Sequence, residues 1–333
     1  MTPLTPADVL ARVAAAIPAK CRANVVIIGS LAAGYHFFRD DGTRSVRTKD
    51  VNCVLEPHHL AVAAGQSVTR QLLRAGWKPA ASGPHSQPGT ADTPTEQLPA
   101  VRFYPPGRRG KSGAASGEWF IELFTVPASE DQPAQSWTRL PLGDGRHYGL
   151  PSFRFLSLTV YRPERAVALG IRYARPSMMA LANLLEHPVI KPETMSALFA
   201  GRAIKRSNKD LGRVLALAFL SGERDLAGWG AEWIGAFRRC FPQHWRELAA
   251  RTGDGLRACA ARQPGRPRRS ASHLPQRAAG DASSIARKAA CRRGDAATRA
   301  GGCFGKCMKS LKSTTRCRAV GCFRSFDLTA KKL

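Results

Sequence analysis

The apolar positions of the first 125 residues fall into two patterns. Short, almost uninterrupted apolar runs bounded by turn residues predict buried β-strands, and apolar residues repeated every three or four positions predict amphipathic helices. The two patterns alternate along this part of the chain, which predicts an α/β fold. Strands are predicted at 24–28, 51–55, 101–104 and 119–124, and helices at 5–17, 31–39 and 57–76.

From about residue 176 onward, the apolar residues follow only the helical pattern, repeated every three or four positions. This predicts a helical region after the α/β part, so the expected fold class is α/β (α+β), with a mixed-sheet core followed by helices. The predicted domains are an α/β domain at 1–160 and a helical domain at 161–252. Within the second, helices are predicted at 176–186, 192–200, 209–221, 229–241 and 244–251.

The composition changes abruptly at Gly253. The segment 253–333 contains 19 Lys and Arg against four Asp and Glu, with few aromatics and no sustained apolar period. Such a segment cannot bury enough apolar surface to fold, so it is predicted to be a disordered basic tail. It also resembles a GC-rich coding region read in a shifted frame. We expect that restoring the frame of the gene would give a helical end instead.

The net charge of the chain is +27. A balance this basic favours polyanionic partners such as nucleotides or nucleic acid. No run is apolar for long enough to cross a membrane, and the N-terminus lacks the pattern of a signal peptide because Asp8 interrupts it. The sequence therefore predicts a cytoplasmic protein with reduced cysteines and no membrane partner.

Three short segments carry candidate chemistry. Gly29 and Ser30 follow a buried strand and begin a helix, where backbone N–H groups can bind phosphate. Asp50 lies at the mouth of the next strand, and Glu122 interrupts the apolar run 119–124. A buried acid without a partner is costly, so Glu122 needs a metal ion, a basic side chain or water. The plainer alternatives are a surface ion pair for Asp50 and a structural salt bridge for Glu122.

These segments resemble the polymerase β-type nucleotidyltransferase superfamily, in which a strand, Gly-Ser, a helix and an Asp-x-Asp strand follow one another. Here Gly29-Ser30 is followed by Asp50-x-Asn52, so an amide occupies the position of the second acid. The resemblance implies that Asp50, Asn52 and Glu122 form the catalytic set, and that Asp50 and Glu122 hold Mg²⁺ in a two-metal site. It further implies that Gly29 and Ser30 bind the triphosphate of an NTP.

A second resemblance concerns Lys205 and Lys209. The segment 205–211 is similar to the Lys-x-x-x-Lys-Asp element of minimal nucleotidyltransferases related to abortive-infection toxins, which implies that both lysines reach the triphosphate. Residues four apart share one face of a helix, so the two cations can clamp one anion. The alternative is a solvated charge run at the start of an amphipathic helix.

Three functions follow from these patterns. The first is a Mg²⁺-dependent enzyme that moves an NMP from an NTP to a hydroxyl of RNA, protein or a small molecule. The second is a catalytically impaired protein of the same fold that binds nucleotide or RNA, which the amide of Asn52 favours. The third is an RNA-binding protein whose affinity comes from the tail alone, so that truncation at Gly253 would abolish binding.

Overall fold

The computed structural model describes residues 4–43, 50–83, 85–106, 119–186 and 206–252, apart from the side chains of 206–209 and 211. The predicted helix at 192–200 and the predicted tail at 253–333 lie outside these ranges.

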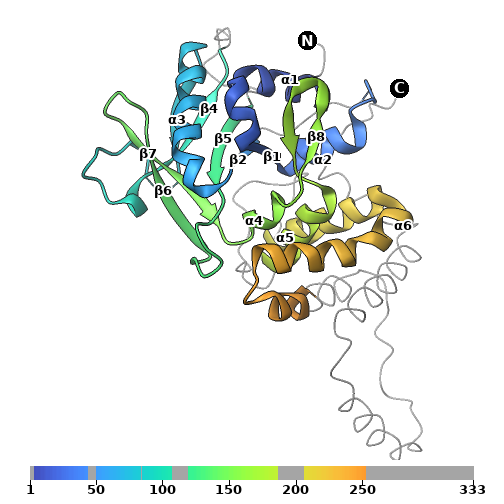
Figure 1. Cartoon of the computed structure of the whole chain (residues 1–333). Helices are drawn as coiled ribbons and strands as arrows, with labels where there is room; N and C mark the ends of the chain where they lie inside the picture. Colours follow the sequence, from blue (N-terminus) through green and yellow to red (C-terminus); the bar gives the residue numbers. More distant parts are fainter. Residues whose placement is uncertain (1–3, 44–49, 84, 107–118, 187–205, 253–333) are drawn as a thin grey trace, which may run out of the picture.

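Within the described ranges, nine strands form one mixed sheet (Figure 1). Its strand order is β6–β7–β4–β5–β2–β1–β9–β8, and β3 lies off this path, paired with β4. β2 runs parallel to β5, whereas β1 runs antiparallel to β2 and parallel to β9. The strands are β1 (Val25–Ile28), β2 (Asp50–Leu55), β3 (Lys78–Ser82), β4 (Ala100–Tyr104), β5 (Phe120–Thr125), β6 (Gln135–Pro141), β7 (His147–Phe153), β8 (Glu164–Ala166) and β9 (Ile171–Tyr173).

Helices cover one face of this sheet. Thr5 caps α1 (Pro6–Ala16): its hydroxyl accepts from the Asp8 N–H, and the Asp8 carboxylate accepts from the Thr5 N–H. α3 (His58–Arg74) packs so closely that a Cβ on Gly65 would lie 3.2 Å from Leu55 Cδ1. Since side chains alternate along a strand, Asp50 and Asn52 of β2 lie on the opposite face from Leu55.

The C-terminal helices gather beside the sheet, in the lower part of Figure 1. α5 (Pro176–Glu186) packs against α6 (Arg206–Cys240), and both contact the short α4 (Leu156–Thr159). α6 is interrupted at Gly222, whose φ of 74° is not helical, and residues 245–252 form a further helix. Trp229 and Trp233 are buried between these helices, and Trp233 Nε1 donates to the Ser177 carbonyl at 3.0 Å.

Ion pairs join the edge of the sheet to these helices. Arg175 lies 3.7 Å from Glu164 Oε1 of β8 and donates to Glu232 of α6. Tyr173 Oη donates to Glu164 Oε2 at 2.6 Å, and His36 Nδ1 lies 3.3 Å from the same oxygen. The His36 ring and the Tyr173 hydroxyl beside this carboxylate lower the pKa of Glu164 to about 2, although burial opposes the shift.

The α/β class with a mixed sheet and following helices is confirmed. The predicted strands and helices of the first 125 residues are all present, with ends displaced by a few residues at most. β3 and β6 to β9 have no counterpart among the strands predicted above. β8 and β9 follow residue 160, where the sequence predicts the end of the α/β domain, and they extend the same sheet beside β1.

In the part of the chain that the structure describes, no helix combines the length and the apolar character that crossing a bilayer requires.

Candidate functional site

The turn from β1 into α2 (Gly29–Phe38) is built around a glycine. Gly29 has a φ of +76°, a conformation that L side chains rarely adopt, and a Cβ there would lie 3.3 Å from Asn52 Nδ2. Ile28, which caps the helix, has no capping side chain. The first N–H groups of a helix lack intrahelical acceptors, so this turn places backbone donors beside Asn52.

The strand register places the three predicted catalytic residues side by side. Ile28 pairs with Asn52 across β1 and β2, and Asn52 pairs with Glu122 across β2 and β5. Asp50 precedes Asn52 by two positions and therefore lies on the same face of β2. The structure thus brings the predicted residues of β2 and β5 to one part of the sheet, next to the Gly29 turn.

Polar contacts connect this group. Asn52 Nδ2 donates to Asp50 Oδ2 at 3.4 Å, and Arg102 Nε of β4 lies 3.4 Å from Glu122 Oε1. The Glu122 side chain is only 14% exposed. Burial raises the pKa of the Glu122 carboxyl; Arg102 offsets part of this shift, and the negative charge of Asp50 adds to it. The acid that the sequence expected to need a partner therefore has one in Arg102.

The side-chain oxygens of Asp50, Asn52 and Glu122 are of the chemical type that binds Mg²⁺. Carboxylate and amide oxygens are hard ligands of the kind that Mg²⁺ prefers. Asp50 and Glu122 are close enough for the charge of the first to raise the pKa of the second, a repulsion that a cation would relieve. Among the described residues no group of three His, Cys, Asp or Glu side chains could hold a metal ion. Where Asp50 and Glu122 come together, the residue between the two acids is an amide, Asn52.

A half-enclosed cavity of about 150 Å³ opens beside the Gly29 turn. It lies between the β1 end of the site and the C-terminal helices, and its lining combines apolar and polar side chains. Asn183 of α5 and Arg213 of α6 supply polar groups to its wall. Asn183 Nδ2 donates to the Met179 carbonyl at 2.7 Å, and Arg213 Nη1 lies 3.3 Å from Asp210 Oδ1. The cavity is lined by Ile28, Gly29, Ser30, Ala33, Asn52, Phe155, Leu156, Thr159, Met179, Ala182, Asn183, Glu186, Arg213 and Leu217.

The two predicted lysines cannot be placed in this cavity. Lys205 lies outside the described residues, and Lys209 belongs to α6 but its side chain is outside them. Sequence reasoning missed Arg213, although a signal existed: it continues the four-residue spacing of Lys205 and Lys209. Asn183 and Arg102 had no such signal, because only the packing of distant elements brings them to the site.

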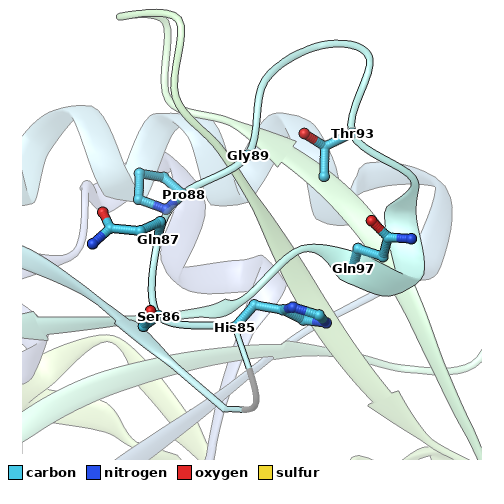
Figure 2. A pocket seen from close by; sticks show the side chains of 7 residues that line it. All are labelled: His85, Ser86, Gln87, Pro88, Gly89, Thr93 and Gln97. Atoms are coloured by element: carbon cyan, nitrogen blue, oxygen red, sulfur yellow. The ribbon is translucent and has the colours of Figure 1, made fainter.

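A second hollow lies elsewhere, on the connection from β3 to β4. Figure 2 shows its polar side chains, and its volume is about 390 Å³. It is lined by His85, Ser86, Gln87, Pro88, Gly89, Thr93 and Gln97, and thus by none of the predicted site residues. Its lining contains no carboxylate, Lys or Arg, so it offers a single metal-ligating side chain, His85, and no fixed charge for a phosphate.

Comparison of the chain with protein-family models, curated proteins and solved structures finds no match in any of the three.

Proposed function

We propose that the protein is a Mg²⁺-dependent nucleotidyltransferase, which moves an NMP from an NTP to an acceptor hydroxyl. The observation that carries this proposal is the register of β1, β2 and β5. It sets Asp50, Asn52 and Glu122 on one face. Asp50 and Asn52 lie on the strand next to β1, which leads into the helix-starting glycine, and Glu122 lies one strand further away. Acids on adjacent strands beside a helix N-terminus suit a metal-bound triphosphate.

The parts of the site have separate tasks. The N–H groups at Gly29 and Ser30 are suited to bind the β- and γ-phosphates, because the start of α2 carries orphan donors and a positive dipole end. The cavity beside them combines apolar side chains with several polar ones, among them Asn183, Glu186 and Arg213, as a nucleoside site requires. Arg213 in its wall brings a positive charge to the same side, which the Asp210 carboxylate 3.3 Å away and the Glu186 carboxylate of the lining offset.

Asp50 and Glu122 would hold Mg²⁺, with the Asn52 amide oxygen beside them. When bound, the ion supplies charge stabilisation to the attacking and leaving oxygens. In the transfer itself, the acceptor oxygen forms a bond to the α-phosphorus, and the bond from that phosphorus to the α–β bridging oxygen breaks. Pyrophosphate leaves with the electron pair, and the hydroxyl proton passes to solvent. The chain's own contribution is to align these groups and to neutralise charge.

A second candidate function is nucleotide binding without turnover. Asn52 favours it, because an amide brings no negative charge to the position between the two carboxylates. Its Nδ2 already faces Asp50, and Arg102 already faces Glu122, so both acids have donors in place of a second metal ion. In this case NTP and Mg²⁺ would bind, but no NMP would move.

Label transfer tests the proposed reaction. The protein is incubated with each α-³²P-labelled NTP, Mg²⁺ and a cell extract, and the label is then followed in nucleic acid, protein and small-molecule fractions. We expect transfer into one fraction that is lost in the Asp50→Asn variant, which removes the charge but keeps the shape. Equal transfer by that variant would overturn the assignment. Binding of NTP without transfer would favour the second candidate.

A further inference from the structure

A row of side chains leads away from the carboxylates on the side opposite the cavity. Asp50 of β2 pairs in register with Phe120 of β5, and Tyr104 of β4 pairs with Lys78 of β3. The rings of Tyr104 and Phe120 connect the two pairs, with centroids 5.5 Å apart. Neighbouring strands lie about 4.8 Å apart, so the row runs for roughly 14 Å from Asp50 to the edge strand. Lys78, Tyr104 and Phe120 are called the aromatic strip below.

Cations lie along the aromatic strip. The Arg102 guanidinium carbon is 4.5 Å from the centroid of the Phe120 ring, and Lys78 at the far end is exposed. Tyr104 and Phe120 are half-buried. Aromatic rings interleaved with Lys and Arg on a sheet face are the combination that binds single-stranded nucleic acid, because bases stack on the rings and the cations attract the phosphates.

The geometry of phosphoryl transfer favours an acceptor that approaches from the β5 side, along the aromatic strip. The Gly29 turn and the cavity lie on the β1 side of Asp50 and Asn52, whereas the aromatic strip lies on the β5 side. In phosphoryl transfer the attacking and leaving oxygens are roughly in line through the phosphorus. If pyrophosphate leaves toward the Gly29 turn, the acceptor hydroxyl must arrive from the side of β5, along the aromatic strip.

We propose that the acceptor is the 3′ end of a single-stranded polynucleotide, whose terminal base stacks on the Tyr104 ring beside Phe120 while Lys78 contacts its backbone. This inference rests on the proposed transferase function and names its acceptor. RNA and DNA share the chemistry of bases and phosphates, and only RNA adds a 2′-hydroxyl.

Fluorescence anisotropy of the full chain with short labelled RNA and DNA of one sequence tests the inference. Loss of one stacking ring should weaken binding of the preferred strand about tenfold in Tyr104→Leu. Tyr104→Phe keeps the ring and should bind within about twofold of the unchanged protein. The ratio of the RNA and DNA affinities identifies which of the two is the acceptor.

Charge controls keep this test independent of the basic tail. Lys78→Glu and Lys20→Glu make the same change at exposed positions, but only Lys78 belongs to the aromatic strip. We expect weaker binding in Lys78→Glu alone, at two salt concentrations. Equal losses in both variants, or no loss in Tyr104→Leu, would overturn the inference. Label transfer from α-³²P-labelled NTP in cell extract is measured with the same preparations, and its persistence would show that the proposed function survives such a failure.

Discussion

The Asn52→Asp variant is expected to transfer NMP about 100-fold faster than the unchanged protein, which corresponds to about 2.7 kcal/mol of transition-state stabilisation. Asn52 lies between Asp50 and Glu122, paired in register with Ile28 and Glu122, so a carboxylate there would face both acids. A third negative charge raises the affinity of the shared position for a divalent cation. The rate of label transfer at saturating Mg²⁺ measures this effect.

Two controls separate charge from position. Asn52→Ala removes the amide without adding charge and should give no gain. The double variant Asp50→Asn with Asn52→Asp keeps the number of carboxylates but moves one of them, and it should be inactive because Asp50 is required. If Asn52→Asp stays as slow as the unchanged protein, the missing carboxylate does not limit the site, and nucleotide binding without turnover becomes the better account.

The Glu122→Gln variant should lose activity and keep its stability. Without the Glu122 carboxylate the predicted metal position has one acid, so transfer should fall at least about 100-fold. At pH 7.5, however, the ionised Glu122 is buried and close to Asp50, so its removal should leave the melting temperature unchanged or higher. Saturating Mg²⁺ should raise the melting temperature of the unchanged protein but not that of the variant.

The shifted pKa of Glu122 predicts how the stability difference between the unchanged protein and Glu122→Gln changes with pH. Burial and Asp50 raise the pKa of Glu122 above its usual 4.5, although Arg102 opposes the shift. A raised pKa stabilises the fold at pH values below 4.5, and this contribution is lost as the pH rises through the higher folded value. The stability of the unchanged protein relative to Glu122→Gln should therefore fall with rising pH.

The matched control is Glu96→Gln, at an exposed position away from the site, which should change neither stability nor rate. A large loss of stability in Glu122→Gln at pH 7.5 would instead show that the Arg102–Glu122 pair is a structural salt bridge.

Local sequence patterns were sufficient to predict the strands and the helix that carry the site residues. Gly29 stands out because an apolar run ends there and a helix begins, and Glu122 stands out because it interrupts an apolar run. These signals say nothing about pairing. That Asn52 aligns with Glu122, and that Arg102 reaches this acid, depends on the order of β2, β5 and β4, which contacts between distant residues decide.

The missed strands have physical reasons as well. β7 contains Gly149 and Pro151, which weaken any strand pattern. β8 and β9 have three residues each, too few for a period to appear. The cavity could not be predicted from the sequence either, because Asn183 and Gly29 come together only when α5 packs beside α2.

Isothermal titration with NTP, in the presence and absence of Mg²⁺, tests whether Asp50 belongs to a metal–triphosphate site. Asp50→Ala is compared with the unchanged protein, and Asp92→Ala, at an exposed position on the β3–β4 connection, serves as the matched control. We expect NTP binding that requires both Mg²⁺ and Asp50 and that survives in the control. Binding that is indifferent to Asp50, or no binding at all, would mean that the arrangement of Gly29, Asp50 and Glu122 belongs to the fold and holds no metal–triphosphate site.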